Sequence, residues 1–393
     1  MASLLPLAST TWSDDEIEEA IKVLRSGKLT MGERVRRFEV EFASYIGTKF
    51  AVMFNSGSSA NLAMLAAVRL LQRPTEKDKP NILVPAVSWS TTFYPVNQAG
   101  YALKFVDVDE RTLNMNVDQA RQSVDEHTVG IFTVNLLGNP AGVAELRTLA
   151  EEKNIFLLED NCEALGAEVG GRKTGSFGLG GSHSFFFSHH MCTIEGGMVT
   201  TDNVELYELM LSIRAHGWTR ELPRVNSVFM KSGNAWEDLF RFVVPGFNLR
   251  PLEISGAIGS IQLSKLPTFI DHRRRNARVF VEIFGDNSYF DIQLEQGESS
   301  WFGFSLILKP GLENLRPRLI EELTRAGVDT RPIVAGNFTR NPVMKHLVYS
   351  PIPALPAADR VHDAGFFFGN HHFDITSELT KVKSLLLGIV SSS

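Results

Sequence analysis

The feature that most constrains the fold is an alternation of short apolar runs with helical patterns between residues 48 and 203. The apolar runs are KFAVMFN, NILVPAVS, KFVDVD, GIFTVNLLG, NIFLLED, SHSFFFS and GMVTTD. Several are apolar at successive positions, which is typical of strands covered by helices on both faces. The alternation therefore predicts an α/β domain built on a mostly parallel, seven-stranded sheet.

The segments on either side of this region predict further elements. Ser13 is followed by Glu16 at capping-box spacing, ahead of apolar Ile17, Ile21 and Leu24, so we expect a helix that ends near Gly27. Residues 221–248 are rich in loop formers. Beyond them the chain predicts helices from Arg250, then the strand SSWFGFSLILK, the helix LRPRLIEELTRAGV and the strand DTRPIV. We therefore expect a large domain over residues 1–249 and a smaller α/β domain over 250–393.

Composition excludes several classes of protein. The net charge of -6, with Lys and Arg scattered along the chain, gives no basic field for nucleic acid. The one dense run, HRRRNAR at 272–278, is interpreted as the solvated side of a helix, with a place near an anionic ligand as the alternative. Two cysteines, Cys162 and Cys192, cannot supply a disulfide framework or a four-thiolate metal site. We expect both thiols to be free and buried, no bound metal, and a cytoplasmic protein.

No apolar run reaches the length of about 20 residues that is needed to span a bilayer, so we expect no membrane partner.

Three local motifs can carry chemistry. In FNSGSSANLAM, Gly57 and Ser58 lie in a small-residue turn before a helix, which favours a phosphate, although a simple helix cap explains the turn equally well. Trp89 follows a strand at the edge where ligands bind in α/β sheets, but a core indole is the alternative. Asp160 and Glu163 follow an apolar strand, where a carboxylate needs either a cationic ligand nitrogen or a neighbouring Arg.

The order and spacing of these motifs resemble those of a known family. With TMGERVRRFEVEFASYIG and GFNLRPLEISGAIG, they are similar to the sugar aminotransferases of the DegT/DnrJ/EryC1/StrS family, which are pyridoxal-phosphate (PLP) proteins of fold-type I, the aspartate aminotransferase fold. The resemblance implies a homodimer with shared active sites. It also implies roles in binding the cofactor: phosphate contacts from Gly57, Ser58 and Ser184, stacking by Trp89, pairing of Asp160 with the ring nitrogen, Glu163 near the ring hydroxyl, and a phosphate contact from Asn248 of the neighbouring subunit.

One position departs from the aminotransferase pattern. Family members that transaminate carry a lysine five residues after the serine matched by Ser184, and the chain has His189 there. No lysine occurs between Lys173 and Lys231. Imidazole forms no stable covalent link to an aldehyde, but it exchanges protons near neutral pH. We therefore expect PLP or pyridoxamine phosphate (PMP) to be held non-covalently and His189 to be the catalytic acid and base.

Within the family, the chain resembles the 3-dehydratases of GDP-linked 4-keto-6-deoxyhexoses. The matching strings include VPAVSWSTTFYP, FFSHHMCTIEGG and RPIVAGNF. The resemblance implies loss of the sugar C3 hydroxyl with release of ammonia, and recovery of PMP from PLP by L-glutamate. On resemblance only, the candidates for the nucleotide-sugar pocket are His216, Trp301, Arg331 and Asn337.

Four alternatives remain open at this point. The adjacent His190 is expected to be packed or solvated, because neighbours in an extended segment face opposite ways. The chain could be a 3-dehydratase of another nucleotide-linked sugar, or an aminotransferase whose lysine lies elsewhere or that has no covalently bound cofactor. An inactive cofactor-binding regulator is the alternative outside enzymes, but no helix-turn-helix extension or basic patch supports it.

Overall fold

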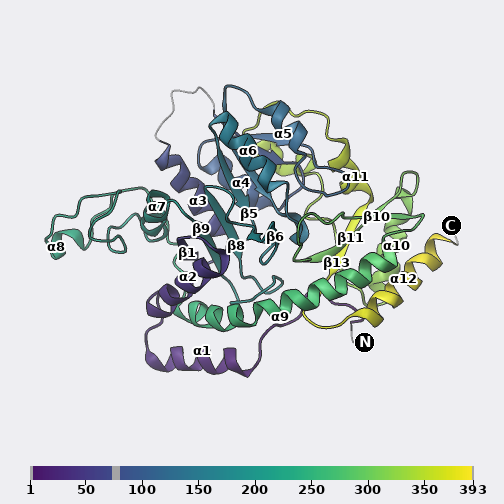
Figure 1. Ribbon diagram of the computed structural model, residues 1–393, viewed down its shortest axis with the longest axis horizontal. Helices are drawn as coiled ribbons and strands as arrows, with labels where there is room; N and C mark the ends of the chain where they lie inside the picture. Colours follow the sequence, from purple (N-terminus) through teal and green to yellow (C-terminus); the bar gives the residue numbers. More distant parts are fainter. Residues whose placement is uncertain (1–2, 73–79, 392–393) are drawn as a thin grey trace.

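The computed structural model describes residues 3–72 and 80–391, and its largest element is a seven-stranded sheet (Figure 1). The strand order is β1-β9-β8-β5-β4-β2-β3, and β9 is the one strand that runs antiparallel to its neighbours. The prediction of a mostly parallel sheet with these seven strands is confirmed. Their bounds are β1 Phe50–Phe54, β2 Asn81–Pro85, β3 Ala102–Val106, β4 Thr128–Val134, β5 Phe156–Asp160, β8 Gly180–Ser184 and β9 Gly197–Thr201.

Helices cover both faces of this sheet, which explains the continuous apolar runs of the strands. In β5, Leu158 joins the core beneath one set of helices, whereas its neighbour Leu157 joins a separate core on the opposite face. The helices of the first face are α3 Gly57–Leu71, α4 Ser90–Gln98 and α7 Val204–Arg214; those of the second face are α2 Glu33–Ile46, α5 Val117–Ser123 and α6 Val143–Lys153.

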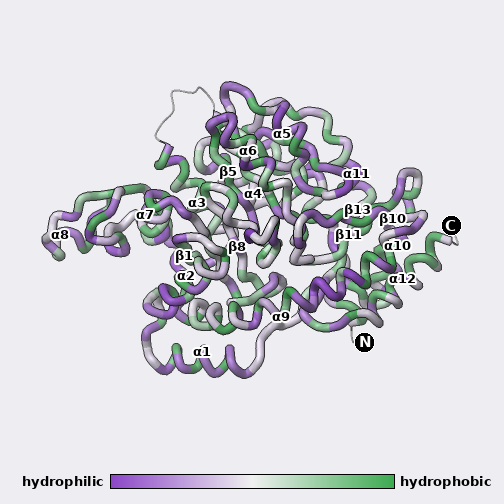
Figure 2. Tube along the Cα trace, viewed as in Figure 1, coloured by the Kyte–Doolittle hydropathy of each residue, from purple (hydrophilic) through white to green (hydrophobic). Residues whose placement is uncertain are grey.

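Helix α1, Asp14–Ser26, has the predicted capping box at Ser13 and Glu16 and ends at Gly27 with φ 70°. The three residues of the predicted apolar stripe do not face the core, however: Ile17, Ile21 and Leu24 are 49%, 39% and 58% exposed, whereas Val23 is buried. The helix instead packs through buried Glu16, which accepts hydrogen bonds from Lys265 and Gln262 of α9. Hydrophobic and hydrophilic positions alternate along α1 (Figure 2).

A second, antiparallel sheet lies beyond the long helix α9, Glu253–Phe284. Its order is β10-β11-β13-β12, which confirms the strands predicted around residues 303 and 330. The helix predicted over 315–328 is present as α10. The bounds are β10 Phe290–Ile292, β11 Gly303–Leu308, β12 Thr330–Arg331, β13 Gly365–Gly369, α10 Arg316–Arg325, α11 Pro356–Ala364 and α12 Thr376–Val390.

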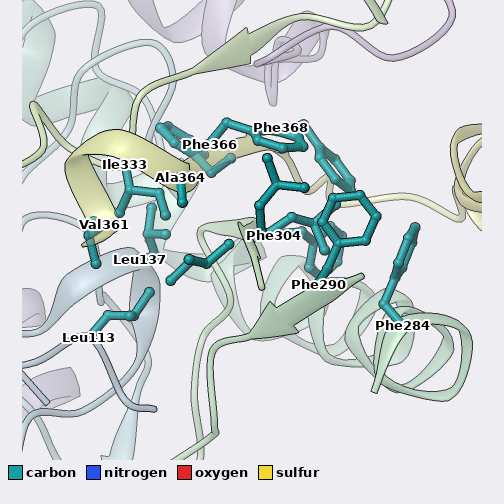
Figure 3. Packing of buried hydrophobic residues seen from close by; sticks show 14 of the residues in the cluster. Leu113, Leu137, Phe284, Phe290, Phe304, Ile333, Val361, Ala364, Phe366 and Phe368 are labelled. Atoms are coloured by element: carbon teal, nitrogen blue, oxygen red, sulfur yellow. The ribbon is translucent and has the colours of Figure 1, made fainter. Parts of the chain in front are cut away.

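The two parts of the chain share one apolar cluster. Leu113 and Leu137, which belong to the first part, lie with Phe304 and Ile333 of the second part (Figure 3). Leu137 reaches this cluster from the short 3₁₀ helix Leu136–Gly138, where its φ is 53°. The division at residues 249 and 250 stays a prediction, because buried contacts cross it.

Residues 220–247 form a projecting arm that contains the short helix α8, Ala235–Asp238 (Figure 1). Its apolar side chains are unusually exposed, with Val225 at 88%, Met230 at 89% and Trp236 at 83%. An apolar patch of this kind on a folded chain marks a contact surface. No helix in the described ranges is both long and apolar enough to cross a membrane.

Candidate active site

The turn between β1 and α3 is built for close approach by a ligand. A Cβ atom at Gly57 would lie 2.5 Å from Ser184 Cβ and 3.1 Å from Cys162 Sγ, so only glycine fits there. Ser56 caps α3 by accepting a hydrogen bond from Ser59 N, and the Ser58 hydroxyl donates to Thr91 Oγ1 at 3.0 Å. The structure therefore brings Gly57, Ser58 and Ser184 together at the positive end of a helix, where a phosphate is favoured.

Asp160 ends β5 and is buried at this same edge of the sheet. Its Oδ2 accepts two hydrogen bonds of 2.8 Å, from Asn61 Nδ2 and Thr92 Oγ1, and its Oδ1 accepts one from Cys162 N. These donors fix the carboxylate without neutralising it. Because no Arg or Lys of the described chain pairs with Asp160, the Arg salt bridge considered from the sequence is absent here.

Asn61 and Thr92 were not identified from the sequence. A buried amide in the apolar helix segment ANLAM was the available signal for Asn61. Thr92 lies in the first turn of α4, three residues after Trp89, which precedes the helix. Trp89 is 59% exposed, so the alternative of a core indole is wrong.

Glu163 lies one turn beyond Asp160 and accepts a hydrogen bond of 2.9 Å from Leu137 N. Loss of hydration, together with the nearby Asp160 charge, raises the pKa of Glu163 to about 7 despite that bond. The group can therefore exist with or without its proton near neutral pH.

His189 lies in a turn beyond β8. The predicted strand SHSFFFS is wrong at its end, because β8 stops at Ser184 and the chain turns at residues 187–191. His189 N donates to Phe186 O at 2.9 Å, and the imidazole lies 5.3 Å from the Phe302 ring. Burial, assisted by Arg273, lowers the pKa of His189 to about 4, so the ring is neutral and able to accept a proton at pH 7.

His190 is fully buried, so of its two predicted environments the packed one is correct. The two histidines do not alternate across a strand as predicted, because they lie in the turn. His190 Nε2 lies 3.1 Å from Ser300 O.

The loop that carries His189 contains no lysine, and the nearest lysines on either side in the sequence have other partners. Lys173 Nζ pairs with Glu168, and Lys231 Nζ donates to Leu222 O. The residues at this edge therefore fit a phosphorylated aromatic ring with a protonated nitrogen, held without a covalent bond: a helix terminus for phosphate, an indole for the ring and a carboxylate for the nitrogen.

The side chains of the other predicted residues form no hydrogen bond with this cluster in the described part of the chain, although Asn337 forms an isolated bridge with Val87, two residues before Trp89. His216, with φ 62°, packs its ring 4.8 Å from Trp218, and its N–H donates to Phe247 O. The neighbouring Asn248 is exposed, pairs with Ala215 by an isolated bridge and accepts a hydrogen bond from Arg250 Nε.

Trp301 and Asn337 are held by contacts within the chain. Trp301 is buried in the C-terminal core, where Nε1 donates to Glu295 Oε1 at 3.2 Å. Asn337 is buried and donates to Asp359 Oδ1 at 2.9 Å. Arg331 is exposed on β12. For these residues, contact with a nucleotide sugar stays a prediction.

The interpretation of HRRRNAR as a solvated helix side holds for Arg275 and Arg278, which are exposed, but is wrong for Arg273 and Arg274. Arg273 is only 4% exposed, because its side chain turns inward to three backbone carbonyls. Arg274 likewise donates to Ser299 O and Gly166 O.

Within residues 3–72 and 80–391, no group of three or more His, Cys, Asp or Glu side chains is placed to hold a metal ion. Cys162 and Cys192 are free thiols, as predicted; Cys192 is also buried as predicted, whereas Cys162 is only partly buried.

Asp160 is a carboxylate at the end of a central parallel strand, and the turn at the start of α3 favours a phosphate at the same edge of the sheet. This is the arrangement of fold-type I PLP proteins. The chain belongs to the DegT/DnrJ/EryC1/StrS aminotransferase family, whose sequence pattern matches residues 11–382.

Individual relatives are similar over almost their full length. The GDP-4-keto-6-deoxy-D-mannose 3-dehydratase of Yersinia pseudotuberculosis is 47% identical over 383 residues, 97% of this chain and 98% of the relative. A crystal structure of GDP-4-keto-6-deoxymannose-3-dehydratase with a trapped PLP-glutamate geminal diamine superimposes with a TM-score of 0.94 at 47% identity, covering 97% of this chain and 100% of that chain. The structure of a His-to-Asn mutant of that enzyme with bound GDP-perosamine gives the same TM-score, identity and coverage. These similarities confirm the fold-type I architecture.

Proposed function

We propose that the protein is a PLP- and PMP-dependent GDP-4-keto-6-deoxy-D-mannose 3-dehydratase, which forms GDP-4-keto-3,6-dideoxy-D-mannose. The observation that carries the proposal is His189: a half-buried, neutral imidazole occupies the position of the cofactor-binding lysine. Support comes from relatives of that name at 47% identity over nearly the whole chain.

The cofactor in its amine form supplies the nitrogen that condenses with the C4 ketone and the two electrons that replace the C3 hydroxyl by hydrogen. PLP and ammonia are released, and L-glutamate returns the amine form as 2-oxoglutarate leaves. His189 removes a proton from the cofactor's methylene carbon and then gives a proton to the departing C3 hydroxyl, which leaves as water. A base that is neutral at pH 7 suits the first of these transfers.

The remaining cofactor residues bind and orient. Gly57, Ser58 and Ser184 bind the phosphate, Trp89 stacks on the ring, Asp160 keeps the ring nitrogen protonated and Glu163 lies near the ring hydroxyl. Three donors hold Asp160 in place for this pairing. The nucleotide-sugar pocket includes His216, Trp301, Arg331 and Asn337.

The active form in this proposal is a homodimer with shared sites. The projecting arm supports this, since it carries exposed apolar residues and ends next to the exposed Asn248. Asn248 of the partner subunit then completes the phosphate site. Two free thiols favour a cytoplasmic location.

The test is incubation with GDP-4-keto-6-deoxy-D-mannose, PLP and L-glutamate, with mass spectrometry of the sugar nucleotide. We expect loss of one oxygen from the sugar, dependent on glutamate. His189→Asn should abolish this loss while PLP still binds, as measured by its absorbance. Turnover that is unchanged in His189→Asn would sink the assignment.

Two further arms separate the alternatives. CDP- and dTDP-linked 4-keto-6-deoxyhexoses should be poor substrates; a preference for one of them would change the nucleotide but keep the reaction. Borohydride treatment of the PLP form should give no covalent adduct, whereas an aminotransferase with a displaced lysine would be labelled.

A further inference from the structure

His190 is the second histidine of the turn, and its ring is fixed by one hydrogen bond. The side chain is fully buried, with Nε2 3.1 Å from the carbonyl oxygen of Ser300. Because a carbonyl only accepts, Nε2 carries the proton. Burial, with Arg273 nearby, lowers the pKa of His190 well below the usual value, so the ring stays neutral and Nδ1 is a buried atom without a partner. The histidine therefore serves as a rigid N–H donor to Ser300.

The segment Ser300–Phe302 that receives this bond joins the second sheet to the first part of the chain. Ser300 N donates to Gly138 O and Phe302 N donates to Leu137 O, both at 2.9 Å. Leu137 in turn donates to Glu163 through its own N–H. Two strained backbones occur here, since the φ angles of Leu137 and Trp301 are 53° and 48°. A conformation of this kind persists only where the surrounding contacts impose it.

Arg273 of α9 holds the same segment from the other side. Its Nη1 donates to the carbonyl oxygens of Phe302 at 3.1 Å and Asn370 at 2.9 Å, with a longer contact to Trp301. No carboxylate of the described part of the chain pairs with this guanidinium, and burial lowers its pKa to about 10, so it remains charged at neutral pH. A buried cation that is held only by carbonyls fixes those carbonyls in place.

Phe302 transmits this arrangement to His189. Its ring lies 5.3 Å from the imidazole of His189 and 5.8 Å from that of His190. We propose that His190 is a positioning residue: by holding Ser300, it keeps the Phe302 ring against His189 and fixes the catalytic imidazole in a defined orientation, with Nδ1 shielded from solvent. This inference rests on the proposed role of His189.

The charged surroundings of the two rings are few. Arg273 acts on both histidines, and Arg274 and His189 act on His190. Ser300, Trp301 and Phe302 bring no titratable group. Release of Phe302 therefore changes the hydration of His189 but leaves the charged neighbours of His189 in place. The pKa of His189 should then move from about 4 towards the ordinary 6.5.

The experiment compares His190→Leu, which removes the donor, with His190→Gln, whose amide N–H can reach the position of Nε2. With GDP-4-keto-6-deoxy-D-mannose as substrate, we expect His190→Leu to lower kcat about 10²-fold. KM should rise by a smaller factor, because Trp301 alone among the four proposed pocket residues lies in the released segment. The acidic limb of its kcat profile should move to higher pH. His190→Gln should restore most of kcat and the original acidic limb. Equal losses in the two variants would overturn the inference.

A second readout does not depend on turnover. NMR of protein labelled at histidine, with the His189 signal assigned from His189→Asn, gives the His189 titration in wild type and in both His190 variants. We expect a higher pKa in His190→Leu and a near-native one in His190→Gln; identical titrations would refute the positioning role. If His190→Leu does not fold, Phe302→Leu is the replacement and should raise the His189 pKa in the same way. A wild type without dehydratase activity would overturn the proposed function, while this titration would still decide the role of His190.

Discussion

At the scale of single residues, burial sets the chemistry of the histidines. His183 of β8 is fully buried, with Nδ1 3.2 Å from Asn161 Nδ2 and Nε2 3.1 Å from Thr200 Oγ1. Loss of hydration lowers its pKa from 6.5 to about 3. Below pH 6.5, the unfolded chain binds a proton at His183 that the folded chain does not bind. The free energy of unfolding therefore falls as the pH drops below 6.5.

We predict that His183 alone makes the unfolding free energy about 2 kcal/mol lower at pH 5 than at pH 7. His183→Gln should lose this share of the pH dependence, as measured by urea unfolding at the two pH values. His346→Gln, which changes an exposed histidine, is the matched control and should keep the wild-type dependence. An unaltered dependence in His183→Gln would show that this ring is not the acid-sensitive group.

His189 could be identified from the sequence because it stands where the family motif has a lysine, and such a departure is visible without a structure. The roles of Asn61, Thr92 and Arg273 could not be predicted, because hydrogen bonds between distant elements leave no local pattern in the sequence. The packed environment of His190 was among the predictions, but its hydrogen-bond partner was not, because Ser300 lies 110 residues further along the chain.

At the scale of elements, the start of α3 shows how a helix terminus is fitted to a ligand. The backbone of Gly57 lies against Ser184 and Cys162, with no room for a methyl group. Gly57→Ala should therefore push β8 away from α3, weaken PLP binding at least about tenfold and destabilise the fold by about 1–3 kcal/mol. A spectroscopic PLP titration and thermal unfolding measure the two effects.

Gly388 provides the matched control for this substitution. It lies in α12, and nothing approaches the position of its missing Cβ within 4 Å. Gly388→Ala should raise stability by about 0.5–1 kcal/mol, because alanine is the better helix former, and should leave PLP binding unchanged. PLP affinity that is equal in the two variants would contradict the fit argued for Gly57.

The helices and strands that could be predicted are those that a local sequence pattern determines. The seven strands and the capped helix α1 follow from apolar runs and a capping box. The face that α1 presents did not follow: Ile17, Ile21 and Leu24 have the spacing of a core stripe and yet are exposed. Periodicity identifies an apolar face, but it does not say whether the chain itself or another molecule covers that face.

At the scale of the whole molecule, the exposed apolar residues argue for a second copy. Met230 and Trp236 of the projecting arm are more than 80% exposed, although side chains of this size and polarity usually anchor interfaces. If the arm packs on a partner, Met230→Asp with Trp236→Asp should convert a dimer into monomers and weaken PLP binding, because the partner's Asn248 leaves the site. Light scattering after gel filtration, with PLP titration on the same samples, measures both. Val204→Asp, at an exposed apolar position on α7 outside the arm, is the control and should stay dimeric. A wild type that elutes as a monomer with full PLP affinity would refute shared active sites.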